Sequence, residues 1–234
     1  MNALEQGHYE HRLIDDPLSA ALLDQYLADL DPGRSYFYEK DIREFETYRN
    51  RLDDALKADN LDPAFTIYNR YQERLVDRLV FALRLIERRL QDTDFGRNET
   101  IETDRKNALW PQDTGAMNDL WRRRLKSAAL NLKLADKPMD ETVRILKQRF
   151  TAQLNQARQI TSDDVFQTYM NSLTRSYDPH TDYLAPRVSE NFNISMSLSL
   201  EGIGAVLQNE NEYTKVVSLV PGGPADAAKQ LRPG

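Results

Sequence analysis

Apolar residues recur every three or four positions along most of the first 177 residues, and this spacing restricts that part of the chain to amphipathic helices. The first such stripe comprises Leu18, Leu22, Tyr26 and Leu30. It begins at Asp16-Pro17, where Asp can cap a helix and Pro fits the first helical position. The breaker Asp31-Pro32-Gly33 follows it. The sequence therefore predicts a first helix between these two points.

Two more helices are expected before a long loop. Apolar positions from Ile42 to Leu56 predict a second helix that ends near Asp59-Asn60. A third begins at Asp62-Pro63 and keeps its stripe to Leu90, a length of ~40 Å at the α-helical rise. The polar segment 91–115, which contains Trp110-Pro111, is expected to cross the surface as a loop.

Three further helices complete the helical part. One carries apolar positions from Met117 to Leu132, and the next, after Pro138, carries them to Leu154. The last opens with a near capping box at Thr161-Ser162-Asp163-Asp164 and ends at Asp178-Pro179. These patterns predict a mainly α protein with a multi-helix N-terminal domain over residues 1–190.

The pattern then changes from helical to strand-like. Apolar and polar residues alternate strictly from Phe192 to Leu200, which predicts a half-buried strand. Two more β-prone runs, 205–207 and 213–220, flank an expected turn at 209–212. After the breaker Pro221-Gly222-Gly223-Pro224, residues 225–231 suit a short helix. Because the chain stops soon afterwards, we expect residues 191–234 to be a truncated second domain.

Composition excludes several classes of protein. The chain has 234 residues, 31 Lys and Arg against 37 Asp and Glu, and a net charge of −6, which argues against nucleic acid as its main partner. No Cys is present, so disulfides, thiol catalysis and Cys-ligated metals are excluded. No apolar run is long enough to span a membrane. The first residues lack an apolar signal core, so the protein is cytoplasmic or its leader was removed.

The histidines do not predict a catalytic or metal site. His8 and His11 lie near a terminus without matching ligands, so we expect a frayed, solvated end and no metal. Asp178 and His180 could belong to a Ser/His/Asp hydrolase, but at this spacing local turn hydrogen bonds are the favoured interpretation. No catalytic residue and no cofactor are assigned.

Two arginine clusters and two tryptophans have structural interpretations. Arg84, Arg88 and Arg89 form one cluster, and Arg122-Arg123-Arg124 forms the other. Phosphate binding would need more such contacts and a positive total charge, so solvated helix faces with i,i+4 partners are favoured. Trp110 and Trp121 are expected to anchor the core or the loop.

The glycine pair Gly202-Ile203-Gly204 is the most informative local feature. It fails as a dinucleotide fingerprint, because the third glycine position holds Leu207 and no long helix follows. Two glycines can instead form a nest of backbone N–H groups that binds a peptide's C-terminal carboxylate. A ligand-free β-bulge explains the same residues equally well.

Three segments resemble the C-terminal processing peptidases. Residues 178–187, beginning Asp178-Pro179-His180-Thr181, are similar to a family segment that precedes the PDZ domain. Residues 197–207 resemble the entry to that PDZ domain, and Gly222-Gly223-Pro224-Ala225 resembles the turn before its first helix. The long helical front half, with Trp110-Pro111, resembles the tail-specific protease branch. The three segments lie within the span 178–225, about 45 residues.

The resemblance implies a serine endopeptidase with a Ser–Lys dyad, in which Lys is the general base. It implies a periplasmic protein whose PDZ domain binds apolar C-terminal tails of substrates, with a lipoprotein adaptor as a further partner. The carboxylate would bind at Gly202, Ile203, Gly204 and Ala205. Strand pairing and an apolar pocket would involve Val206, Leu207, Leu198 and Leu200. The catalytic domain would follow this chain, which makes these 234 residues noncatalytic.

A different class of function stays open at this point. The chain could be a stand-alone helical scaffold or adaptor that binds a protein partner and carries a vestigial β module. The reading frame beyond Gly234 separates the two hypotheses, because only the protease continues into further strands and a catalytic domain. A hydrolase that uses His180 would require activity in these 234 residues.

Overall fold

The computed structural model describes residues 2–197, 202–210 and 213–233. It confirms a mainly α protein and contains, within these ranges, a two-stranded antiparallel sheet. The chain divides into two compact units, Met1–Tyr183 and Leu184–Gly234. Within the described ranges, every helix is too short or too polar to cross a bilayer.

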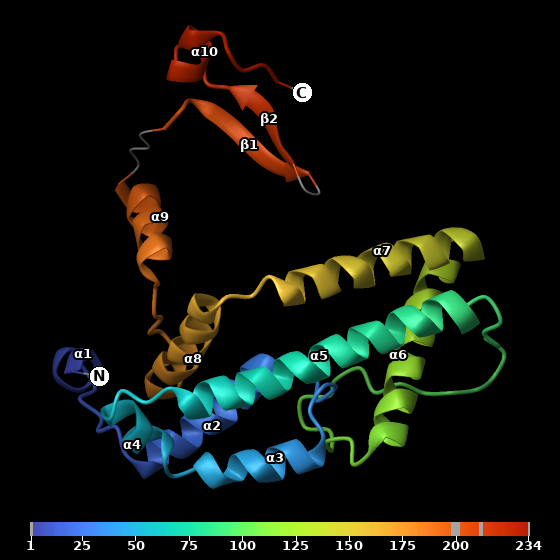
Figure 1. The fold of residues 1–234 in the computed structure, drawn as a ribbon, viewed down its shortest axis with the longest axis horizontal. Coiled ribbons are helices and arrows are strands. Elements are labelled where there is room, and N and C mark those ends of the chain that lie inside the picture. Colours follow the sequence, from blue (N-terminus) through green and yellow to red (C-terminus); the bar gives the residue numbers. More distant parts are fainter. Residues whose placement is uncertain (1, 198–201, 211–212, 234) are drawn as a thin grey trace. The chain divides into compact units, whose positions relative to one another are not determined.

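The first unit is built around one long helix (Figure 1). This helix, α5, spans Asp62–Arg89, as its apolar stripe predicts. The other helices of the unit are α1 (Asn2–Gly7), α2 (Asp16–Leu30), α3 (Glu39–Phe45), α4 (Leu52–Lys57), α6 (Thr114–Leu134), α7 (Met139–Arg158) and α8 (Ser162–Tyr177).

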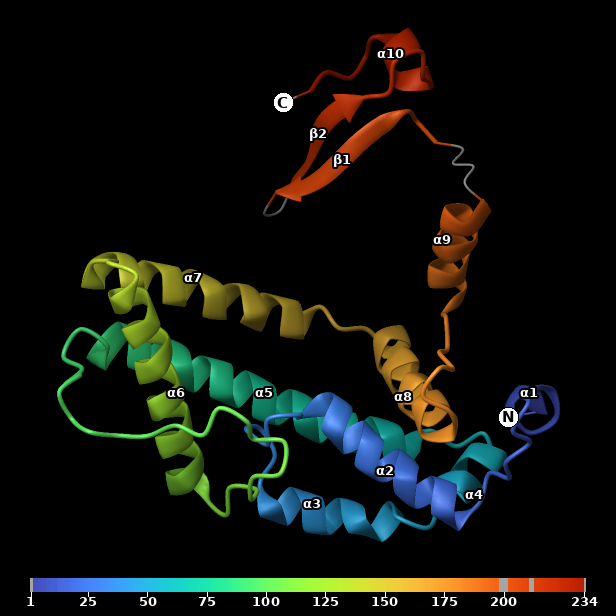
Figure 2. The ribbon, with the colours of Figure 1, turned by 180° about the vertical axis from the view of Figure 1, so that it is seen from behind.

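Three apolar clusters lie along α5. Its N-terminal part packs with α2, α4 and α8, where Tyr26 and Tyr169 meet edge to face at 5.1 Å. Its middle packs on α6 and α7 around Met117 and Trp121. Its C-terminal part packs on the same two helices around Leu125 and Leu146. Figure 2 shows α2 and α8 beside the N-terminal part of α5. Because α5 contributes residues to all three clusters, it joins them.

The helix ends explain why sequence patterns locate most of these elements. The Asp15 carboxylate, one residue earlier than expected, caps α2 by accepting from the Leu18 N–H at 3.2 Å. Thr161 and Asp164 form the expected capping box at the start of α8. Each cap satisfies N–H groups that a helix start leaves without partners.

The prediction of one second helix over 42–56 is wrong. The structure has α3, a 3₁₀ turn over Glu46–Tyr48 and then α4. Contacts with α2 stabilise the break: Arg49 pairs with Asp24 at 2.8 Å, and the Leu52 N–H donates to Ser19 Oγ at 2.9 Å. These long-range hydrogen bonds replace helical ones, and local periodicity does not report them. The short helix α1 was also not predicted.

Both tryptophans are anchors, as expected. Trp121 on α6 is buried and donates from Nε1 to the Ser35 carbonyl at 2.7 Å. Trp110 packs on Phe37 from the long loop, with the Arg34 guanidinium 5.1 Å from its ring centre. The expected loop between α5 and α6 is thereby fastened to the chain segment that follows α2.

A buried carboxylate connects α3 to α5. Asp41 is fully buried and accepts hydrogen bonds from Arg70 at 2.6 Å and from Arg74 at 2.8 and 2.9 Å. It also accepts from the Tyr38 N–H at 3.0 Å. Burial alone would raise the pKa of Asp41, but the hydrogen bonds from Arg74, Tyr38 and Arg70 outweigh it and hold the pKa below its usual range.

The second unit contains α9 (Pro186–Ser197), β1 (Ala205–Glu210), β2 (Tyr213–Leu219) and the short α10 (Pro224–Ala228). The strands pair antiparallel from Ala205 opposite Leu219 to Glu210 opposite Tyr213. The register is irregular between Val206 and Leu207, where Leu207 lies opposite Val216. Both strands and the short helix are present as predicted, but β1 continues to Glu210 into the expected turn, and α10 ends at Ala228.

The strand predicted over 192–200 is wrong for residues 192–197, which form the end of α9. A helix satisfies its own backbone hydrogen bonds, whereas a strand needs a neighbour. In the described ranges, β1 and β2 pair only with each other, so this segment has no strand partner there. Phe192, Ile194 and Met196 are consequently exposed on the helix. The remaining predicted strand residues, including Leu198 and Leu200, lie outside the described residues.

Candidate functional site

The glycine pair lies immediately before β1, and Gly204 has a left-handed backbone with φ of +72°. Such a conformation disfavours residues that carry a Cβ, so glycine is favoured there. Ala205 begins β1. The chain therefore turns at Gly204 to enter β1. Both the carboxylate-binding nest and the ligand-free β-bulge require such a turn.

The breaker Pro221-Gly222-Gly223-Pro224 holds this turn in place. The Gly204 carbonyl accepts from the Val220 N–H at 2.8 Å, and the Ile203 carbonyl accepts from the Ala225 N–H at 2.8 Å. These two bonds join Ile203 and Gly204, just before β1, to Val220 after β2 and to Ala225 in the first turn of α10. Residues separated in the sequence thus form one compact backbone site.

The site depends on a close approach of two backbones. A Cβ on Gly204 would lie 3.1 Å from both the Gly223 Cα and the Pro224 Cδ. A Cβ on Gly223 would lie 3.0 Å from the Val220 carbonyl oxygen and 3.2 Å from the Gly204 Cα. The sequence pattern does not relate Gly223 to the site, because the contact is long-range. The repeated glycine pairs were its only sequence signal.

The free polar groups of the turn are N–H donors. Within the described residues, the Ile203 and Gly204 N–H groups donate to no acceptor, while both carbonyls accept hydrogen bonds. Adjacent N–H groups at a left-handed turn suit an anion such as a carboxylate. The chemistry that this arrangement offers is therefore anion binding by backbone amides, without a side-chain acid, base or nucleophile.

The residues assigned to strand pairing and the pocket are only partly brought together. Val206 and Leu207 lie in β1, and their side chains, like that of Ile203, are about half exposed. In the described part of the chain, β1 pairs only with β2, so its other edge has no described neighbour. Leu198 and Leu200 cannot be placed, because they lie outside the described residues.

Asp178 and His180 form a turn. The Asp178 carboxylate accepts from the His180 N–H at 3.2 Å and from Thr181 Oγ1 at 2.9 Å. Burial would raise the pKa of Asp178, but the hydrogen bonds from Thr181, His180 and Tyr9 hold it below its usual range. The exposed His180 therefore donates its backbone N–H to this carboxylate within a local turn.

The prediction of a solvated end is wrong for His8. Its side chain is 12% exposed, and its Nε2 lies 3.0 Å from Thr181 Oγ1 and 3.8 Å from Asp178 Oδ2. The Tyr177 hydroxyl donates to the Arg12 carbonyl at 2.7 Å, so this hydrogen bond also joins the N-terminal segment to α8. The N-terminal segment is thus attached to the end of α8, whereas His11 is exposed. Within the described residues, no cluster of acidic residues and histidines could hold a metal ion.

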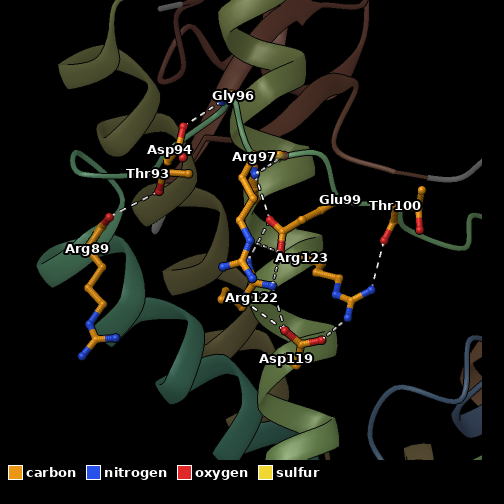
Figure 3. Close-up of polar contacts among 11 residues, drawn as sticks. Arg89, Thr93, Asp94, Gly96, Arg97, Glu99, Thr100, Asp119, Arg122 and Arg123 are labelled. Carbon is orange, nitrogen blue, oxygen red and sulfur yellow. Dashed lines mark hydrogen bonds and ion pairs between the residues drawn. The ribbon is translucent and has the colours of Figure 1, made fainter.

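Two arginines of the second cluster, Arg122 and Arg123, are engaged in ion pairs, shown in Figure 3, while the Arg124 guanidinium lies 4.8 Å from the Trp121 ring centre. Arg122 binds Glu99 at 2.5 Å and Asp119 at 2.7 Å, and Arg123 binds Asp119 at 2.5 Å. Hydrogen bonds from Arg122 and Lys126 lower the pKa of Glu99 to about 2. The pairs of Glu99 with Arg122 and Lys126 hold the long loop against α6.

Comparison with known proteins gives two findings. Residues 1–187 match the protein family described as the tail specific protease N-terminal domain. The chain is also 39% identical, over 232 residues, to the tail-specific protease of Haemophilus influenzae. That alignment covers 99% of this chain and 33% of the relative. The chain therefore spans a third of the length of the curated relative that it matches.

Proposed function

This chain belongs to the tail-specific protease family, and from that membership we propose that it is the N-terminal region of an endopeptidase that selects substrates by their apolar C-terminal tails. The observation that carries the proposal is the backbone site at Gly204. There a left-handed turn with N-H donors precedes a strand whose second edge lacks a described neighbour.

The proposed binding mode is strand addition. The tail's carboxylate accepts hydrogen bonds at Gly202, Ile203, Gly204 and Ala205, and its backbone pairs with the edge of β1 at Val206 and Leu207. Leu198 and Leu200 are proposed to line an apolar pocket. An apolar side chain buried in such a pocket gains ~1.5–3 kcal/mol, which explains a preference for apolar tails.

The domain organisation follows from the same proposal. Residues 1–190 form the helical N-terminal domain, and residues 191–234 are the first part of a PDZ domain. The complete protein works in the periplasm as a serine protease with a Ser–Lys dyad, and a lipoprotein adaptor is its candidate partner. The dyad lies outside these 234 residues, so this chain does not cleave substrates. The chain spans 33% of the relative, which supports placing the dyad in another part of the complete protein.

A cleavage assay tests the proposal. An unstructured protein with an apolar tail is incubated with the 234-residue chain, with its His180→Ala variant and with the complete protein. We expect cleavage by the complete protein alone. Cleavage by the 234-residue chain above the His180→Ala control would contradict the proposal and support a hydrolase that uses His180. Failure of the complete protein to distinguish apolar from charged tails would refute the assigned specificity.

A further inference from the structure

The arginines of α5 and α6, which are far apart in the sequence, line one cleft. Its walls comprise Phe81, Arg84, Leu85, Arg88 and Arg89 from α5 and Asn118, Asp119 and Arg122 from α6. The cleft has a volume of about 580 Å³, enough for several side chains of a ligand. The sequence predicts two separate solvated faces, and the packing of α6 on α5 instead gives them a common surface.

The acidic groups at this surface are already engaged. Asp119 is held by Arg122 and Arg123, and Glu99 is held by Arg122 and by Lys126 at 2.8 Å. Figure 3 shows Arg122 between these two carboxylates, while the Arg89 side chain points away from them. The charge of Arg122 is therefore compensated, and the cluster on α5 has to be considered separately.

Arg84, Arg88 and Arg89 are exposed, and within the described residues none of them lies within ion-pair distance of a carboxylate. Glu87, the nearest acid in the sequence, pairs with Lys147 of α7 at 2.6 Å. Arg84 and Arg88 are one helical turn apart, a spacing at which like charges destabilise a helix. The cleft therefore concentrates positive charge in a protein whose net charge is −6.

We propose that this arginine cleft, defined by Arg84, Arg88 and Arg89, binds an acidic segment of a partner protein. Guanidinium groups match carboxylates in bidentate geometry, and the side chains of Phe81 and Leu85 give apolar residues of the segment a surface to contact. A phosphate or nucleic acid would not use that apolar surface, whereas an acidic segment that also carries apolar residues would. This proposal is independent of tail binding, because it involves other residues in the other unit.

Binding of a synthetic peptide to the 234-residue chain tests the proposal. The probe is a fluorescent peptide of about 12 residues that alternates Glu pairs with Leu, measured by anisotropy at ~0.15 M salt. The Arg84→Gln, Arg88→Gln double variant should weaken binding at least tenfold, about 1.4 kcal/mol. The matched control, Arg43→Gln with Arg149→Gln, makes the same charge change on exposed positions of α3 and α7 and should alter binding less than twofold.

Several results would overturn the proposal. Equal weakening by both double variants would show that net charge alone attracts the peptide. Equal binding of the same peptide with Gln in place of Glu would remove the role of the carboxylates. Displacement of the peptide by anionic lipid vesicles or duplex DNA at matched charge would assign the cleft to a different class of partner. Failure of the wild-type chain to bind the probe below roughly 1 mM would also refute it.

Discussion

The substitution Asp41→Asn tests how the first unit is held together. Asp41 is fully buried and carries the only negative charge within hydrogen-bond distance of Arg74 in the described structure. Asparagine keeps the shape and can still accept from the Tyr38 N–H, but it leaves two guanidinium groups without their buried carboxylate. Breaking a buried ion pair from one side costs about 3–5 kcal/mol.

The expected loss is smaller than that range, because the Arg70 and Arg74 side chains are 26% and 18% exposed and retain some hydration. We therefore expect Asp41→Asn to lower the free energy of unfolding by about 2–3 kcal/mol. For a unit of this size, that corresponds to a Tm lower by about 4–12 °C.

The assay is urea unfolding followed by far-ultraviolet circular dichroism, with Glu44→Gln as the matched control. Glu44 also pairs with Arg70, at 3.0 Å, but its side chain is 55% exposed, so its removal should cost no more than ~1 kcal/mol. Because the pKa of Asp41 is lowered by folding, its stabilisation is complete above its unfolded pKa and is lost as the pH falls through the lower folded value. Equal losses for Asp41→Asn and Glu44→Gln at pH 7 would refute the reasoning.

Three further predictions concern local features. Gly204→Ala and Gly222→Ala both place a Cβ on a left-handed residue, which costs about 1–2 kcal/mol, but only the Cβ of Gly204→Ala meets other atoms at 3.1 Å. Amide exchange of β1 and β2 should therefore accelerate more in Gly204→Ala than in Gly222→Ala. Equal exchange rates in the two variants would contradict the close approach. Trp121→Phe should lower the free energy of unfolding by about 1–3 kcal/mol, because a buried carbonyl loses its donor, and an unchanged urea midpoint would exclude that role. Thermal unfolding at several pH values compares wild type with Glu99→Gln. The stability difference between them should be constant above pH 4.5 and vanish as the pH falls through about 2. A difference that persists at lower pH would contradict the ion-pair account.

Local chemistry explains which parts of the fold are predictable from sequence. The start of α5 at Asp62-Pro63 and the capping box of α8 depend on residues close together in the chain, so pattern analysis finds them. The break between α3 and α4 depends on hydrogen bonds to Ser19 and Asp24 of α2. No local pattern contains that information.

The difference between local patterns and long-range contacts also explains the errors in the predicted strands and sites. The alternation over 192–197 describes which residues could share a strand face, but a strand forms only with a partner, and the described residues have a helix there. Gly204 could be identified as a turn residue from sequence, whereas its contact with Gly223 could not. The arginine cleft likewise arises only when α6 packs on α5.

Recognition of the tail carboxylate is the central claim, and peptide titration tests it most directly. Apolar-tailed peptides are titrated in free-acid and amidated forms into the complete protein and into its Gly204→Val variant. We predict that the wild type binds the free acid at least tenfold more tightly than the amide, about 1.4 kcal/mol, and that Gly204→Val removes this preference by distorting the turn. Equal affinity of the wild-type protein for both forms would contradict the assignment of the carboxylate site.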